Sequence, residues 1–316
     1  MLLDSLNGAR WFTTLDVFSG FYNIEIDECD RDKTAFVVPG SPGGLYRFKR
    51  MPYGLCNAPA TFCRVMDTLF GDLIYKFVLI YIDDFIIYSR SFEEHLEHVR
   101  VVLERLATAG LKVKLKKCFF AQSEVEFLGH LVSAAGISSS PQKVDAIFRM
   151  VAPTSVRGVR TFLGMTSYYR RYIFRYASVA EPLNALLKKD TPFQWNDVHQ
   201  RSFNELKRLL CEAPIMSHFD PELPVEIHTD ASAYGVGAVC VQRQNGEERV
   251  IAYASKTLNK AQRNYGATEL EVLAVVFGIE KFRYYALNNM QFKVVTDHSA
   301  ISALLRTKYP DGRLAR

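Results

Sequence analysis

The segment FVLIYIDDFIIYS, residues 77–89, places two adjacent aspartates between two short runs of β-branched and aromatic residues. Such runs are typical of β-strands, and Asp is a favoured turn residue. The segment therefore predicts two antiparallel strands joined by a tight turn that presents Asp83 and Asp84 at its tip, exposed and close together. Two carboxylates so placed repel each other unless a cation neutralises them. A solvated Asp-Asp turn is the alternative interpretation.

A third carboxylate belongs to the same pattern. Asp16 ends an apolar run in FTTLDVFSGFYNIEI, residues 12–26, just before the turn residues Ser19 and Gly20. If this strand lies beside the hairpin in one sheet, Asp16 faces the two other aspartates. Three carboxylates could then hold two Mg²⁺ ions roughly 3.5 to 4 Å apart, the arrangement that serves in-line phosphoryl transfer. Magnesium suits oxygen-only ligands.

Composition sets the class of protein. With 316 residues and 48% hydrophobic content, the chain is long enough for two or three domains with buried cores. No apolar run approaches the roughly 20 residues that span a membrane, and no targeting signal is found. We therefore expect a cytoplasmic protein without membrane partners. The cysteines show no CxxC spacing, so we expect them to be reduced and mostly buried rather than bound to zinc or paired: Cys29, Cys56, Cys63, Cys118, Cys211 and Cys240.

Basic residues are clustered although the net charge is only +5. LKVKLKK occupies residues 111–117, and RRYIFR, with interleaved aromatic residues, occupies 170–175. Both stretches permit binding to a polyanion.

The pattern along the chain changes twice. Between residues 11 and 133, strand-like runs alternate with helical patterns at 58–72 and 92–109, which is typical of an α+β fold. From 137 to 217 the pattern is almost entirely helical, and four prolines there indicate helix starts and stops: Pro141, Pro153, Pro182 and Pro214. After a turn-rich boundary at 218–224, three strand-like runs precede a helix at 263–284 and a further strand.

The motifs resemble those of a known family. LDVFSGFYNIEID, YRFKRMPYGLCNAPATFCRVMD, YIDDFIIYS and KKCFFAQSEVEFLGHLVS follow the order found in the reverse transcriptase of gypsy-like long-terminal-repeat retrotransposons. RTFLGMTSYYRRYI, TDAS, ELEVLAVVFGIEKFRYY and TDH resemble the connector and ribonuclease H region of the same polyproteins. The resemblance covers essentially the whole chain, and several motifs in the same order are far more specific than any one of them.

The resemblance implies an α+β architecture in three parts. Residues 1–134 would form a polymerase palm, a ferredoxin-like antiparallel sheet with helices, together with partial fingers. Residues 135–217 would form a helical thumb and connection, and residues 218–316 a ribonuclease H-like α/β domain that is incomplete at its C-terminus. The implied enzyme is an RNA-directed DNA polymerase, a nucleotidyltransferase, with an attached endonuclease that hydrolyses RNA in RNA/DNA hybrids.

The resemblance assigns the three N-terminal aspartates to metal binding. Asp16, Asp83 and Asp84 would hold two Mg²⁺ ions, with Mn²⁺ as a substitute, that activate the primer 3′ hydroxyl and grip the incoming triphosphate. Phe21 matches the aromatic gate that selects dNTPs over rNTPs, although a core aromatic is the alternative. Ser19 and Gly20 could offer backbone N–H groups to phosphate oxygens, as turn nests do.

Further substrate contacts follow from the same resemblance. Tyr53 and Gly54 would form the floor of the nucleotide and template pocket, and they lie just before a helix that Asn57 could cap. FLGH, residues 127–130, resembles the primer grip, which assigns Phe127, Leu128 and Gly129 to substrate binding. Lys116 or Lys117 could supply a proton to pyrophosphate, whereas a lysine run is more often a solvated or phosphate-contacting face.

A second carboxylate set resembles the ribonuclease H site. Asp230 ends a strand, Glu271 lies on the helix and Asp297 ends the later strand, so the three could hold another two Mg²⁺ ions. Glu269 is two positions from Glu271 and faces another side of the helix. His298 is interpreted as a neutral neighbour of Asp297 rather than a ligand.

Some features of the family have no counterpart in the sequence. Its reverse transcriptases begin well upstream of this chain, and its ribonuclease H carries a fourth carboxylate near its terminus, so we expect both sites to be incomplete at their edges. The implied partners are RNA template, DNA primer, RNA/DNA hybrid, dNTPs and the absent protease and integrase domains, within a cytoplasmic virus-like particle. The alternative is a non-catalytic retroelement remnant that at most binds nucleic acid.

Overall fold

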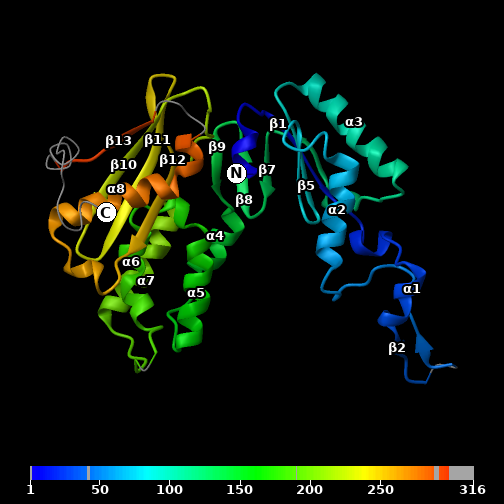
Figure 1. The fold of residues 1–316 in the computed structure, drawn as a ribbon, viewed down its shortest axis with the longest axis horizontal. Coiled ribbons are helices and arrows are strands. Elements are labelled where there is room, and N and C mark those ends of the chain that lie inside the picture. Colours follow the sequence, from blue (N-terminus) through cyan, green and yellow to red (C-terminus); the bar gives the residue numbers. More distant parts are fainter. Residues whose placement is uncertain (1, 41–42, 190, 288–291, 299–316) are drawn as a thin grey trace. The chain divides into compact units, whose positions relative to one another are not determined.

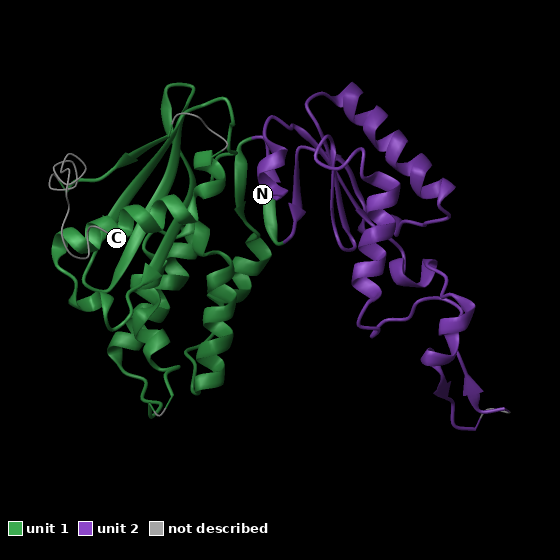
Figure 2. Cartoon of the chain, in the orientation of Figure 1, with its two compact units in different colours: residues 1, 129–131, 135–316 green, residues 2–128, 132–134 purple. Residues whose placement is uncertain are grey.

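The structure is a computed structural model that describes residues 2–40, 43–189, 191–287 and 292–298 (Figure 1). The chain divides into two compact units, coloured purple and green in Figure 2. Residues 2–128 and 132–134 form the purple unit, called here the N-terminal unit, and residues 129–131 and those from 135 onward belong to the green, C-terminal unit.

The N-terminal unit is built on a four-stranded sheet with the order β4-β5-β1-β6. All neighbouring strands in it are antiparallel. The chain enters this sheet at its third position, passes through helix α2, forms the β4–β5 hairpin, and returns through helix α3 to the edge strand. This is the strand order of the ferredoxin-like fold, as predicted. The elements are β1 (Trp11–Asp16), α2 (Ala58–Phe70), β4 (Val78–Tyr81), β5 (Asp84–Ser89), α3 (Phe92–Thr108) and β6 (Phe119–Gln122).

Helices α2 and α3 contribute to the same core as one face of this sheet. Leu15, Phe85 and Ile87 on the strands are buried in one cluster with Phe62 of α2 and Val102 of α3. Side chains alternate between the faces of a strand, so the residues next to Leu15 and Phe85 project from the opposite face. Both helices lie within two residues of their predicted ranges, which confirms the helical periodicity.

Short elements complete this unit. A two-stranded ribbon of residues 36–37 and 45–46 extends from it, as Figure 1 shows for β2. The remaining elements are η1 (Leu2–Leu6), η2 (Gly20–Asn23), α1 (Glu28–Arg31), η3 (Asp32–Thr34), β2 (Phe36–Val37), β3 (Leu45–Tyr46), η4 (Leu115–Lys117) and β7 (Glu124–Phe127), where η marks a 3₁₀-helix.

The C-terminal unit contains a mixed four-stranded sheet with the order β12-β11-β10-β13. The first three strands are antiparallel, and β13 pairs with β10 in parallel. Helix α8 packs on β10 and β11, where Gly278 lies so close to Ile227 and Thr229 that any side chain at 278 would meet them. The elements are β10 (Val225–Ala231), β11 (Gly235–Gln244), β12 (Glu247–Thr257), η6 (Gln262–Asn264), α8 (Ala267–Lys281), α9 (Arg283–Leu287) and β13 (Phe292–Val295).

Helices precede this sheet in the chain, but the prediction of an almost entirely helical segment from residue 137 needs two corrections. The segment opens inside strand β9, and Pro182 lies within helix α6 rather than at its end. The helix tolerates the missing N–H of Pro182 because Ala180 and Leu183 beside it are fully buried and hold it in place. The elements are β8 (His130–Ser133), β9 (Gly136–Ser139), α4 (Pro141–Phe148), α5 (Val156–Tyr168), η5 (Arg170–Tyr172), α6 (Tyr176–Ala185) and α7 (Asp197–Cys211).

The helical segment and the second sheet form one compact unit, so the division into units has no boundary at residue 217. Contacts between the two parts explain this: the Ala177 N–H donates to Ser255 Oγ at 2.9 Å, and the Ser217 N–H donates to the Val250 carbonyl at 2.9 Å. The three-part organisation stays a prediction.

Two predictions from composition can be compared with the structure. All six cysteines are free, but burial of most of them was wrong, because only Cys240 is buried and Cys29, Cys56 and Cys211 are exposed. Among the described residues, no helix is both long and apolar enough to cross a membrane.

Candidate active sites

Three carboxylates of the N-terminal unit meet at the edge of its sheet. Asp16 at the end of β1 lies directly opposite Asp84 at the start of β5 in the antiparallel register, so both project from the same face. This is the face opposite the α2–α3 core. The turn consists of Ile82, with φ 57°, and Asp83, so Asp84 belongs to the strand rather than to the tip of the turn as predicted.

Asp83 is held in an electrostatically unfavourable position. Its Oδ1 is buried and has no hydrogen-bond partner among the described residues. A Cβ at Gly20 would lie 3.2 Å from this oxygen and 2.9 Å from Phe62 Cε2, so the absence of a side chain at residue 20 makes room for the carboxylate. Burial, followed by the charges of Asp84 and Asp16, raises the pKa of Asp83. Burial and the charge of Asp16 raise the pKa of Asp84, against the lowering effect of Lys117.

Lys117 partly neutralises this cluster. The chain before it runs beside the end of β1, where the Lys114 N–H donates to the Asp16 carbonyl at 2.8 Å. The Lys117 ammonium then lies 2.9 Å from Asp16 Oδ2, and this hydrogen bond raises the pKa of Lys117. In this conformation Lys117 is a counter-ion of Asp16, and its role as a proton donor to pyrophosphate stays a prediction. The structure gives no such contact for Lys116.

The proposed nucleotide-contacting residues lie nearby but differ in exposure. Phe21 is buried between the rings of Tyr53 and Phe62, with centroid distances of 5.2 and 5.6 Å, so it is both a core residue and a neighbour of Gly20. Tyr53 is exposed, and Gly54 has φ +95° in open space. Asn57 occupies the N-cap position of α2, but its side chain makes no capping hydrogen bond, so that part of the prediction is wrong.

Ser19 adopts the left-handed conformation, with φ 49°, immediately before the short helix η2. Its carbonyl accepts the Tyr22 N–H at 2.8 Å. Ser19 and Gly20 therefore form the sharp turn that was predicted, next to Asp83.

The FLGH segment forms a tight turn between β7 and β8. Leu128 and Gly129 both have positive φ, 49° and 70°, as a two-residue turn of type I′ requires. The Gly129 carbonyl accepts a hydrogen bond from the Tyr169 hydroxyl at 2.8 Å. Phe127 is buried, so its side chain belongs to the core and only the backbone and the turn residues are available to a ligand.

A second carboxylate cluster forms in the C-terminal unit. Asp230 is near the end of β10, and Asp297 follows the parallel strand β13, so both lie at the same edge of the sheet. Glu271 reaches this edge from α8. Burial raises the pKa of Glu271, and the charges of Asp297 and Asp230 raise it further. Its Oε2 is buried without a partner among the described residues, whereas Glu269 accepts the Gly266 N–H at 2.8 Å and caps the helix.

The sequence interpretation missed Arg175, which lies beside this cluster. Its Nε and Nη2 donate to Asp230 Oδ2 at 2.8 and 2.5 Å. The other arginines of RRYIFR bond to backbone carbonyls of β12: Arg170, which stays exposed, donates to Ser255 and Arg171 donates to Ile251. The basic stretch at 170–175 is therefore partly engaged within the unit. Local periodicity contains no signal for these partners, which are distant in sequence.

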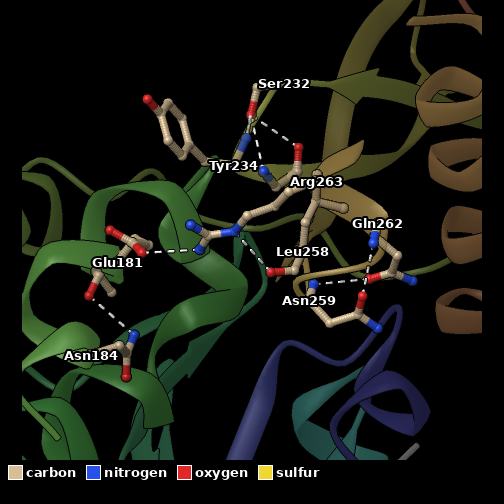
Figure 3. A network of polar contacts seen from close by, with 10 residues as sticks. Glu181, Asn184, Ser232, Tyr234, Leu258, Asn259, Gln262 and Arg263 are labelled. Atoms are coloured by element: carbon tan, nitrogen blue, oxygen red, sulfur yellow. Dashed lines mark hydrogen bonds and ion pairs between the residues drawn. The ribbon is translucent and has the colours of Figure 1, made fainter. Parts of the chain in front are cut away.

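Figure 3 shows a network of polar contacts that joins the segment before α8 to α6. Arg263, in the segment before α8, pairs with Glu181 of α6 at 3.0 Å and donates to the Leu258 carbonyl at 3.3 Å. In the loop after Asp230, Ser232 Oγ donates to the Gly235 carbonyl and accepts the Gly235 N–H. The segment that leads into α8, which carries Glu271, is thus tied to the helix that Arg175 precedes, and the loop after Asp230 is braced by its own hydrogen bonds.

Family models match both parts of the chain. Residues 1–132 match the model for reverse transcriptase (RNA-dependent DNA polymerase), and residues 195–311 match that for the RNase H-like domain found in reverse transcriptase. Three Drosophila melanogaster relatives are retrovirus-related Pol polyproteins, from transposons opus, 297 and gypsy, which are 40%, 41% and 36% identical over 99%, 100% and 100% of this chain. The chain belongs to the reverse transcriptase–ribonuclease H region of retrotransposon Pol polyproteins. It spans about a third of those relatives, at 32%, 29% and 31% of their lengths.

Solved structures share the fold of this reverse transcriptase region. A foamy viral protease-reverse transcriptase dRH in complex with double-stranded DNA superposes with a TM-score of 0.88, at 23% identity over 99% of this chain and 54% of that one. The foamy viral protease-reverse transcriptase in complex with RNA/DNA hybrid gives 0.80, at 23% identity over 98% and 42%. These matches confirm the α+β fold.

Enzymes of both matching families generally depend on divalent metal ions. Within the described ranges, no three His, Cys, Asp or Glu side chains are already arranged to hold a metal. The carboxylates nevertheless fit a cation, because Asp83 Oδ1 and Glu271 Oε2 are buried oxygens without partners and lie beside like charges. Lys117 supplies one positive charge to the first cluster and Arg175 supplies one to the second, so most of the negative charge of each cluster is unbalanced.

Proposed function

We propose that this chain catalyses RNA-directed DNA synthesis at Asp16, Asp83 and Asp84 and cleaves RNA in RNA/DNA hybrids at Asp230, Glu271 and Asp297. The observation that carries the polymerase assignment is the register that places Asp16 opposite Asp84, with the partnerless oxygen of Asp83 beside them. Two Mg²⁺ ions per site, or Mn²⁺ in their place, would supply activation of the attacking oxygen and neutralisation of the leaving group. Asp16 and Asp83 are proposed as the primary ligands.

The chain's own residues would then hold the substrates. Phe21 and Tyr53 form an aromatic wall beside Gly20, which supports a role in dNTP selection. The partly exposed turn of Leu128 and Gly129 would lie against the primer end. The partners proposed are RNA template, DNA primer, dNTPs and the protease and integrase domains, in a cytoplasmic particle.

A basic groove in the C-terminal unit supports nucleic-acid binding. It has a volume of about 530 Å³ and is lined by four cations and no acidic residue: Arg160, Arg170, Lys256 and Lys281. Hydroxyl groups of Ser167, Ser255 and Thr257 also line it. Phosphate groups are bound by such combinations of cations and hydroxyls.

Asp83→Asn tests the polymerase assignment. The variant should abolish primer extension on poly(rA)/oligo(dT) and weaken Mn²⁺ binding, because a ligand charge is lost, while hybrid affinity stays within a few-fold. Asp72→Asn is the matched control, since Asp72 pairs with Arg105 on the surface and should leave both properties unchanged. Wild-type extension by the Asp83→Asn variant would refute the assignment.

A further inference from the structure

Arg175 occupies a backbone conformation that an arginine adopts at a cost. It precedes α6 with φ 52° and ψ 30°, in the left-handed region. A residue with a Cβ atom is destabilised by about 1 to 2 kcal/mol in this conformation, which Gly and Asn adopt most often. Arginine at this position is therefore explained by its side chain rather than by the turn.

That side chain reaches across the sheet to Asp230. Gly237 on β11 lies opposite Asp230 in the register, and a Cβ there would be 3.9 Å from Arg175 Cγ, so the glycine leaves room for the arginine stem. The guanidinium carbon lies 5.1 Å from the centre of the Phe174 ring. Both hydrogen bonds end on Oδ2, and the two side chains are half and one-third exposed.

The anchoring of α6 fixes this contact. The Ala177 N–H bonds to Ser255 on β12, and Glu181 pairs with Arg263 one turn further along the helix. A residue directly before α6 is consequently held close to the end of β10. No other basic side chain of the described residues pairs with Asp230, Glu271 or Asp297 in an ion pair.

We propose that Arg175 is a positioning residue of the nuclease site: it holds Asp230 when no metal ion is bound and, once displaced by a divalent cation, donates to a phosphate of the bound strand. The inference rests on the proposed nuclease function. A guanidinium and a divalent cation compete for the same carboxylate oxygen, so the ion pair lowers metal affinity. A released guanidinium remains within reach of the site and presents a planar fork of N–H donors that matches a phosphate.

The test uses the whole chain in an Asp83→Asn background, which weakens cation binding in the N-terminal unit. Arg175→Asn keeps a residue that tolerates the left-handed backbone, Arg175→Lys restores the charge, and Arg208→Gln removes another surface arginine whose ion pairs are with Glu205 and Glu212 on and next to α7. Calorimetry measures Mn²⁺ binding, and hybrid binding is measured in Ca²⁺ over a range of salt concentrations. Glu271→Gln identifies the binding that belongs to this site.

Arg175→Asn should bind Mn²⁺ about two- to five-fold more tightly, the range expected for loss of a partly exposed ion pair. It should also bind hybrid more weakly, with a slope of log K against log salt shallower by about one, and Arg175→Lys should restore most of that slope. Equal Mn²⁺ affinity with and without Arg175→Asn in this background, or the same changes in Arg208→Gln, would overturn this inference but not the proposed nuclease function. Mn²⁺ binding that is insensitive to Glu271→Gln would overturn the nuclease assignment as well.

Discussion

The N-terminal unit should lose stability on mild acidification because of one buried histidine. His95 of α3 is fully buried, with Nε2 hydrogen-bonded to Thr13 on β1 at 2.7 Å and Nδ1 to Ser89 on β5 at 2.9 Å. Burial, with a smaller effect of the neighbouring His98, lowers the pKa of His95 from 6.5 to about 4, against the raising effect of Glu94. The imidazole that joins the two strands carrying Asp16 and Asp84 is therefore neutral at pH 7.

The sign and size of the effect follow from these pKa values. Between pH 6.5 and about 4 the unfolded chain binds a proton at this residue and the folded chain does not, so the free energy of unfolding falls as pH falls. The contribution is fully present above pH 6.5 and is lost by about pH 4. At about 1.4 kcal/mol per pH unit, the whole interval amounts to roughly 3 kcal/mol.

Residue-resolved hydrogen exchange of the β1, β5 and α3 amides, corrected for intrinsic rates, measures this loss. His95→Gln should be less stable at pH 7 by about 1 to 3 kcal/mol, since it disturbs buried hydrogen bonds. Between pH 6.3 and 5.0 its stability should fall less steeply than that of the wild type, by about 1.4 kcal/mol per pH unit. His199→Gln is the control, because Gln can still cap α7 from that position and the residue lies in the other unit. Parallel pH profiles for wild type and His95→Gln would refute the reasoning.

Three further predictions concern the sites. Gly20→Ala should destabilise the N-terminal unit by about 1 to 3 kcal/mol and weaken Mn²⁺ binding, because the new methyl group meets Phe62 and the Asp83 oxygen. Denaturation measures the stability and calorimetry the Mn²⁺ affinity, and an unchanged stability and affinity would contradict this packing. Phe21→Val should accept rNTPs better relative to dNTPs in kcat/KM, and an unchanged ratio would leave Phe21 a core residue only. Replacing Lys256 and Lys281 together by Gln should make the salt dependence of hybrid binding shallower by about one to two, whereas an unchanged slope would remove the groove from the binding surface.

Much of the fold could be read from local sequence patterns. The 3.6-residue periodicity of 58–70 and 92–108 and the β-branched runs on either side of Asp83 specify helices and strands through interactions among near neighbours. The same patterns place Asp16 and Asp297 at strand ends, and the topology then brings each to other carboxylates. The local patterns were misleading where residues distant in the sequence pack together: Pro182 lies inside a helix that buried residues hold in place. Phe127 is buried, and its contact with substrate stays a prediction.

The sequence by itself determined which residues are carboxylates, which elements carry them and in what order those elements follow. Only the tertiary structure decided the charges around them. Lys117 reaches Asp16 from 101 residues away and Arg175 reaches Asp230 from 55 residues away, through sheet register and helix anchoring that no local pattern contains. Whether a side chain reaches such a partner depends on the whole path of the backbone between them. The acidic residues of both clusters can therefore be identified from the sequence, whereas their counter-ions can be identified only in the folded chain.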